Sequence, residues 1–411
     1  RKNDSIMENT FLITKCMLIP SEGSSLQEEY DIIAGNPIID YYESVESPSI
    51  SMTVSFIDVD QVIGRKGITG GEYIDLIVKV DDEGANDFKV MHDKQKMILN
   101  SVRNMITESN KQVATLEFVS VETLVNETAR LNKKYTGNIS DIVVELLVGD
   151  TKGIQTAKTL FGPEDESLGE DNVKKDRATN SYSFVGNLKR PFDTIQWLCP
   201  KAQSANDDFG FLFYETLDGY HFRSIKSLLE QDAITYQQTD AQGIANKILQ
   251  NNLNQTNDIG MNMRMGMYAN RTIYVDIENQ TLETVDFKAD DIKTKKKAAL
   301  PANIQDYPTR LMVRVDDVGA AQVGAAKTDV QPKSELAKYQ NKSYIRNNLL
   351  FSQSLSISIP LNTTLRAGFA LNIKLPLKQE DGDSNVDSYG SDRSNDPSGR
   401  YLIGELRHLI G

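Results

Sequence analysis

The chain has 411 residues, with 45 Lys and Arg against 58 Asp and Glu and a formal net charge of −13. A chain of this length predicts about three domains and a core that needs neither disulfides nor metal, and its two cysteines, Cys16 and Cys199, fit a reducing compartment. The negative charge excludes tight nucleic-acid binding, which depends on neutralising phosphates, and no apolar run approaches the roughly 20 residues of a membrane helix.

The first 120 residues predict β-structure. Residues 11–19 are rich in branched side chains and stop at Pro20, and residues 50–56 and 74–80 alternate between apolar and polar. Residues 113–120 form another candidate strand. Short alternating strands with turns between them indicate a barrel or a sandwich. The glycines between two of these strands predict a flexible turn and not a phosphate loop, because no Gly-Lys-Ser/Thr follows them: Gly64, Gly67, Gly70 and Gly71.

Helices are predicted after this β region. Ser120 and Ser140 are candidate N-caps of two helices, and the polar stretch 162–180 predicts a loop. Pro191 suits the first turn of a third helix, which Pro200 would end. Cys199 shares the apolar face of that helix and is therefore expected in the core, not as a nucleophile.

An aromatic hairpin gives the strongest local signal. Residues 209–214 and 220–222 flank Asp218-Gly219, and Gly tolerates the positive φ of a hairpin turn. His221 lies in this hairpin and is expected to be a sheet residue, not a base. The three histidines have no helical ligand spacing, which argues against a zinc site. A further helix is predicted over residues 240–251.

Four methionines alternate with other residues in the next segment: Met261, Met263, Met265 and Met267. This period of two predicts a strand with one buried face, and an adaptable contact surface is the alternative. Residues 286–342 have no clear pattern. The lysines at 293–297 predict a solvated loop, with a partner-binding or conduit-lining role as the alternative.

Alternation returns in residues 355–359 and 368–375, and residues 401–410 close the chain. Residues 354–359 and 368–375 echo residues 49–54 and 72–79. We interpret this echo as one β module present twice, so that three chains would present six modules around an axis.

An acidic loop is the candidate cation site. Asp381, Asp383, Asn385 and Asp387 have the i, i+2, i+4, i+6 spacing of calcium loops. Val386 stands where such loops need Gly, and the twelfth position is Asp392 instead of Glu. A solvated loop is therefore predicted, with calcium as the weaker alternative, and we expect no cofactor.

The sequence resembles the central baseplate hub protein of large contractile-tailed phages and the hub part of type VI secretion spikes. The resemblance spans nearly the whole chain. It depends on the order of the segments and on their residue patterns, because none of these segments is a catalytic signature. Those segments are residues 49–80, residues 188–198 with the hairpin 209–222, residues 357–368, and residues 398–408.

The resemblance implies an α+β, mainly β fold, with two related antiparallel β-barrel (tail-tube-like) domains and a mixed α/β region between them. The implied divisions are a first barrel at 1–119, a middle domain at 120–255, a second barrel at 256–285 and 346–411, and an insertion at 286–345 packing on the middle domain.

The implied function is structural. A homotrimer would form a pseudo-sixfold ring in the tail baseplate of a virion, assembled in the host cytoplasm, and DNA would pass through it without specific binding. The implied partners are the trimeric central spike with its lysozyme-type domain, tail-tube or tube-initiator proteins and baseplate wedge proteins, with no membrane. A carbohydrate-binding tail-fibre protein and a cell-wall hydrolase are the alternatives. A single tryptophan, Trp197, argues against a sugar platform.

Overall fold

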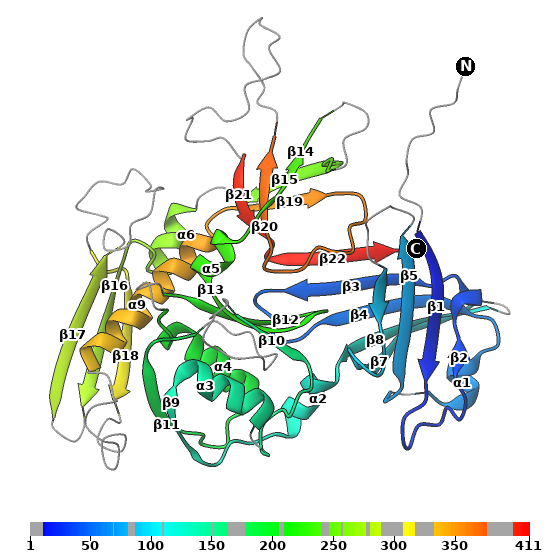
Figure 1. Ribbon diagram of the computed structural model, residues 1–411, viewed down its shortest axis with the longest axis horizontal. Coiled ribbons are helices and arrows are strands. Elements are labelled where there is room, and N and C mark those ends of the chain that lie inside the picture. The colour runs from blue at the N-terminus through cyan, green and yellow to red at the C-terminus, as the bar shows by residue number, and fades with distance from the viewer. Residues whose placement is uncertain are drawn as a thin grey trace, which may run out of the picture.

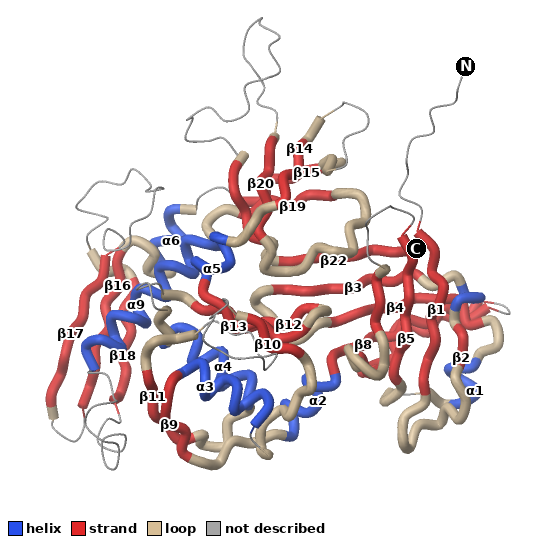
Figure 2. The backbone as a smooth tube through the Cα atoms, viewed as in Figure 1, coloured by secondary structure: helices blue, strands red, loops and turns tan. Residues whose placement is uncertain are grey.

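The structure is a computed structural model that describes residues 11–411 apart from 69, 81–86, 109–110, 150, 163–176, 205–208, 240–245, 256–257, 277–279, 289–306, 317–332 and 376–397. A large sheet lies at one end of the long axis and a small sheet with a long helix at the other (Figure 1). Shorter strands and most of the helices lie between them (Figure 2). The described residues are mostly β-structure with predominantly antiparallel sheets, as expected.

The first sheet contains nine strands of the described chain, in the order β2-β1-β5-β7-β8-β4-β3-β22, with β6 paired to β5. Four predicted strands are confirmed. The strands are β1 (Phe11–Ile19), β2 (Tyr30–Asp31), β3 (Ile38–Ser44), β4 (Ser51–Asp58), β5 (Tyr73–Val80), β6 (Phe88–Val90), β7 (Met97–Glu108), β8 (Lys111–Ser120) and β22 (Glu405–Ile410). Two short helices accompany them, η1 (Ile33–Gly35) and α1 (Val62–Lys66), and α1 occupies part of the predicted glycine-rich turn before ending at Gly67 with φ 64°.

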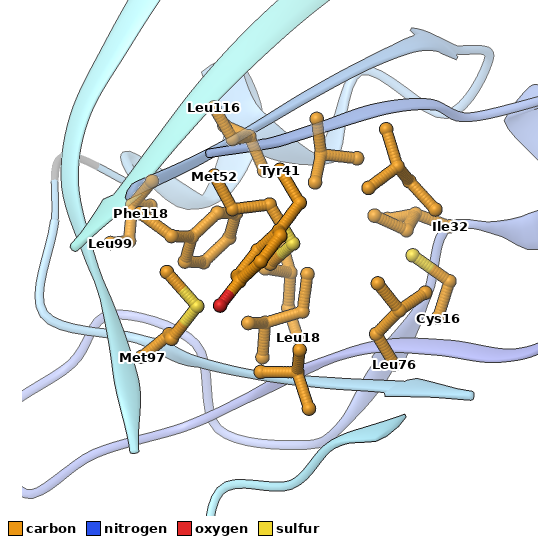
Figure 3. Packing of buried hydrophobic residues seen from close by; sticks show 14 of the residues in the cluster. Cys16, Leu18, Ile32, Tyr41, Met52, Leu76, Met97, Leu99, Leu116 and Phe118 are labelled. Carbon is orange, nitrogen blue, oxygen red and sulfur yellow. The ribbon is translucent and has the colours of Figure 1, made fainter. Parts of the chain in front are cut away.

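The inward side chains of this sheet form one core. Cys16, Leu18 and Leu76 come from one half of the sheet and Met52 and Phe118 from the other, and all lie in one buried cluster (Figure 3). The sheet therefore curls so that its two halves face each other, and each large side chain contributes about 1.5–3 kcal/mol by burial. The ends β2 and β22 are not paired with each other, so the described strands do not form a closed barrel.

The middle region mixes helices and short strands. Its helices are α2 (Val121–Thr128), α3 (Ile139–Val144), a π-helical turn η2 (Glu145–Gly149), α4 (Pro191–Leu198), η3 (Cys199–Lys201) and α5 (Ile225–Glu230). Strands β9 (Lys134–Asn138) and β11 (Ser181–Val185) pair, and β10 (Thr159–Phe161) joins the predicted hairpin, β12 (Phe211–Thr216) and β13 (Gly219–Ser224). The two faces of this hairpin are buried, which explains its aromatic content.

The predicted cap at Ser140 is wrong by two residues. Asn138 is the N-cap of α3, and its side chain accepts a hydrogen bond from the Ser140 backbone N–H. Ser140 lies in the first turn, and its hydroxyl accepts from the Ala178 N–H at 2.7 Å. The predicted N-cap Ser120 is confirmed by position, but its hydroxyl makes other contacts that are described below.

Two small sheets lie beside the hairpin. One has the order β14-β20-β21, with β14 (Ile234–Gln237), β20 (Ala370–Lys374) and β21 (Gly399–Leu402), and the other pairs β15 (Gln250–Gln255) with β19 (Ser354–Ser358). The helix predicted over 240–251 is wrong in its described part, because Leu249 pairs with Ser358 and β15 starts at Gln250. The echo segments also pair differently. β5 runs antiparallel to β1, whereas β20 runs parallel to β14.

A unit that we call the arm forms the far end of the molecule. It contains α6 (Ile259–Arg264), the sheet β17-β16-β18 and α9 (Lys333–Leu350), with β16 (Ala269–Asp276), β17 (Thr281–Lys288) and β18 (Arg310–Asp316). Helix α9 packs on β16, β17 and η3.

The strand predicted for the methionine stripe is wrong, because Asp258 caps α6 there by accepting from the Met261 N–H at 2.8 Å. Met261 and Met265 are 48% and 37% exposed, so their alternation does not mark a buried face. Among the described helices, none combines the length and apolar character needed to cross a bilayer.

Candidate functional site

Three parts of the chain meet at one buried junction. The first sheet contributes β3 and the β4 and β8 ends, the middle region contributes α2 and the β12–β13 hairpin, and the C-terminal part contributes residues 361–368. Apolar side chains from all three parts form one cluster there, which includes Val45, Tyr214 and Ala367. Their shared burial fixes the angle between the parts.

Glu43 is the first of two carboxylates that join these parts. Its Oε1 accepts from the Tyr41 hydroxyl and the Leu217 N–H, each at 2.8 Å, and its Oε2 accepts from the Ala367 N–H at 2.8 Å. The side chain is 1% exposed. Burial raises the pKa of Glu43 to about 7, because it outweighs the backbone donors, Arg366 and Tyr41. One carboxylate therefore links β3, the hairpin turn and the C-terminal part.

Glu215 is the second carboxylate. Its Oε2 accepts from the Ile50 N–H at 3.1 Å, and its Oε1 accepts from Lys158 Nζ at 2.6 Å and lies 2.8 Å from Ser120 Oγ. Lys158 also donates to Glu122 at 2.7 Å, and Thr156 donates to the other oxygen of Glu122. This network joins the hairpin to the end of β8 and the start of α2.

The charges of this network do not support catalysis. Burial acts to lower the pKa of Lys158, but the negative charges of Glu215 and Glu122 outweigh it and raise that pKa. Lys158 Nζ lies 2.6 Å from Ser120 Oγ, yet a lysine that keeps its proton cannot accept one from a hydroxyl. Burial raises the pKa of Glu215. Burial also acts to raise the pKa of Glu122, but the charge of Lys158 and the hydrogen bonds that Glu122 accepts outweigh it and lower that pKa. The cluster is a structural clamp.

A glycine allows the C-terminal part to approach the hairpin closely. Gly368 has φ 84°, and a Cβ at this position would lie 2.0 Å from the Tyr214 hydroxyl. Arg366 adds a charged contact, with Nε 3.0 Å from an oxygen of Asp218 in the hairpin turn. The chain then returns to the first sheet as β22, which pairs with β3.

Three residues singled out in the sequence, Cys199, His221 and Trp197, lie among other side chains of the middle region. Cys199 is buried, and burial raises the pKa of its thiol to about 12, so it is a core residue as predicted. His221 lies in β13 between the rings of Tyr214 and Phe161, and burial lowers its pKa to about 3. Trp197 lies on α4 as predicted, with Lys201 Nζ 3.5 Å from its ring centroid.

The calcium candidates lie outside the described residues: Asp381, Asp383, Asn385 and Asp387. The lysines at 293–297 also lie outside them. Within the described part of the chain, no group of three or more His, Cys, Asp or Glu side chains could hold a metal ion.

Sequence reasoning missed the junction. A signal existed for Glu43, which shares the inward phase of Ile39 and Tyr41 in β3, so an alternation pattern places its carboxylate in the core. Glu122 and Glu215 had no such signal, because their shared partner Lys158 lies 36 and 57 residues away in the sequence.

In comparisons with known proteins, this chain is similar to several solved structures. No protein-family model matches the chain, and no curated protein matches it. The tail protein from Neisseria meningitidis MC58 has 8% identity and a TM-score of 0.49 over 97% of this chain and 92% of its own. The 43 kDa tail protein of prophage MuSo2 from Shewanella oneidensis has 8% identity and a TM-score of 0.47 over 96% and 93%.

An E. coli component of the type VI secretion system also has a similar structure, with 10% identity and a TM-score of 0.34 over 62% of this chain and 58% of its own. By their names, these three structures are a tail protein, a prophage tail protein and a component of the type VI secretion system.

Proposed function

We propose that this chain is a structural subunit of a contractile phage tail, and specifically the central hub of its baseplate. Three copies would form a pseudo-sixfold ring that joins the tail tube to the trimeric central spike and lets DNA pass during ejection. The division into residues 1–119, a middle domain at 120–255, residues 256–285 with 346–411 and an insertion at 286–345 remains part of this proposal.

The observation that carries the proposal is the buried junction. An adaptor between two symmetries transmits force through fixed angles, and Glu43 and Glu215 connect the three parts of the chain at their centre. Two buried carboxyl groups with a donor at each oxygen strongly disfavour other arrangements, because breaking a contact leaves a buried polar or charged group unpaired. The ion pairs of Lys158 with Glu122 and Glu215 are those of a structural network, which favours a structural role over the hydrolase alternative.

The test is assembly with the proposed partners. Co-expression with the spike and tube-initiator proteins should give a complex with three copies of this chain, measured by light scattering after gel filtration. Electron-microscopy class averages viewed end-on should show a ring. A monomer in the presence of both partners would contradict the proposal, and so would muralytic activity of the purified chain.

A further inference from the structure

The sheet of the arm leaves one of its faces uncovered in the described structure. Asn270, Thr272 and Tyr274 of β16 are buried on the side of α9, and Thr272 donates to the Asn341 side chain of that helix. The intervening residues of β16 point to the opposite face. One face of the sheet therefore packs on a helix, while no described element packs on the other.

Most of the opposite face is apolar, and the ion pair between Arg271 and Asp286 also lies on it, beside Leu311. Leu282, Leu311 and Val313 are 66%, 64% and 66% exposed. The strand register places Val275 opposite Leu282 and Ile273 opposite Val313, so these five side chains lie together; we call them the arm face. Contiguous exposed apolar side chains mark interaction surfaces, whereas single ones are ordinary.

The distribution of charge along the chain indicates which partner binds the arm face. Residues 259–351, which include the arm, carry 14 Lys and Arg against 11 Asp and Glu, a net of +3. The rest of the chain carries 31 against 47, a net of −16. The arm is thus the positively charged part of an acidic chain, and other copies of the same chain are electrostatically complementary to it.

The opposite end of the molecule is the most suitable counterpart. Residues 22–66 carry nine Asp and Glu against two Lys and Arg, and the exposed acids at β2 and just before α1 define what we call the acidic end: Glu28, Glu29, Asp31 and Asp60. Burial and the charges of Asp58, Asp60 and Asp31 raise the pKa of Tyr30 to about 12, so Asp31 and Asp60 of the acidic end lie near one ring. The arm lies at the other end of the long axis (Figure 1).

We propose that the arm face docks on a second copy of this chain, at the acidic end of that copy. The contact joins two different surfaces, so it is head-to-tail and closes a ring when the rotation between copies permits. The inference rests on the proposed function, because three-fold closure is what a hub requires. It adds the two surfaces that make the contact.

The main test uses two leucines of nearly equal exposure. Leu311→Glu places a carboxylate on the arm face against the acidic end, and Leu188→Glu, at 65% exposure against 64%, is the matched control in the middle region. Leu311→Glu should weaken self-association by about 30-fold or more, as for a central interface residue. The control variant Leu188→Glu should leave self-association unchanged. Light scattering and sedimentation over a concentration series measure this, and circular dichroism verifies that both variants fold.

A second measurement identifies the counterpart. Equal amounts of ¹⁴N- and ¹⁵N-labelled chain are mixed and cross-linked with a carbodiimide, which joins amines to carboxylates at contact distance. Mixed-isotope peptides joining Lys288 of β17 to Glu28, Glu29 or Asp60 are expected. Glu28→Lys with Glu29→Lys should weaken association, whereas Glu46→Lys, an exposed acid outside the acidic end, should not.

The outcomes separate the two proposals. A trimer whose stability is unaffected by Leu311→Glu overturns the inference and leaves the proposed function standing, as does a trimer in which Lys288 cross-links only to other regions. Open oligomers of increasing mass that Leu311→Glu abolishes support the contact and contradict the hub. A chain that is monomeric alone and with its partners overturns both.

Discussion

The junction and the arm both bury polar side chains, but in different ways. At the junction the buried groups are ionisable, and each oxygen of Glu43, Glu122 and Glu215 has a donor. In the described part of the arm the buried polar groups are neutral. Several atoms there have no hydrogen-bond partner in the described structure, namely Tyr268 Oη, Asn270 Oδ1, Gln340 Oε1, Asn341 Nδ2 and Asn347 Oδ1.

This difference has an energetic reason. An unpaired buried charge costs several kcal/mol, so a charged junction forms completely or not at all. An unpaired buried amide costs about 1–3 kcal/mol, which an interface with apolar contacts can tolerate. We therefore expect the junction to be stiff and the arm to be held more weakly, and four experiments test that contrast.

Glu215→Ala should have the largest effect. It leaves the Ile50 N–H without its acceptor and removes one of the two carboxylates that compensate buried Lys158, so unfolding free energy should fall by about 3–5 kcal/mol. Urea denaturation measures the loss. Glu230→Ala, at a 66% exposed side chain, is the control and should change stability by less than about 0.5 kcal/mol. A loss below about 1 kcal/mol for Glu215→Ala would show that the junction is not stiff.

Gly368→Ala should destabilise by about 3 kcal/mol, because it combines overpacking against Tyr214 with a positive φ. Thermal unfolding of the single and double variants measures the two contributions. Tyr214→Phe should recover part of the loss by removing the hydroxyl at the closest contact. The absence of any coupling between the two positions would contradict the close packing described here.

The pH dependence of Glu43 should give an intermediate effect. Because its pKa is raised in the folded state to about 7, its contribution to stability is present below the unfolded pKa of about 4.5 and is lost as pH rises through about 7. The stability of the wild type relative to Glu43→Gln should thus fall by about 2–3 kcal/mol between these values. Denaturation at a series of pH values measures this difference, and a constant difference would be inconsistent with the raised pKa.

Gln340→Leu should have the smallest effect. Replacing a buried amide whose oxygen has no partner with a similar apolar side chain should leave stability within about 1 kcal/mol, or increase it. Chemical denaturation together with hydrogen exchange of α9 measures both global and local stability. A loss as large as that of Glu215→Ala would remove the contrast between the two regions.

Local elements of the fold were predictable from the sequence. The alternation in residues 11–19, 50–56, 74–80 and 113–120 predicted strands β1, β4, β5 and β8 because the side-chain period of a strand is two. Asp218-Gly219 predicted the hairpin, and Pro191 predicted the start of α4. These signals act within a few residues, so no distant contact overrides them.

The methionine stripe shows where this reasoning fails. Its period of two was strict, yet the Asp258 cap and the first turn of α6 decide the backbone there. The candidate site was less predictable than the fold, because it contains one inward-phase glutamate and a network in which Glu215 lies 95 residues from Ser120 and 165 from Ile50.

The sequence by itself determined the strands, the aromatic hairpin and the acidic charge of the chain, since each follows from neighbouring residues or from composition. The tertiary structure decided that Arg407 of β22 pairs with Asp40 of β3, that β20 runs parallel to β14, and that Glu43 reaches Ala367. A periodic pattern records which side of a strand is buried but not which surface covers it. That choice depends on contacts between residues hundreds of positions apart.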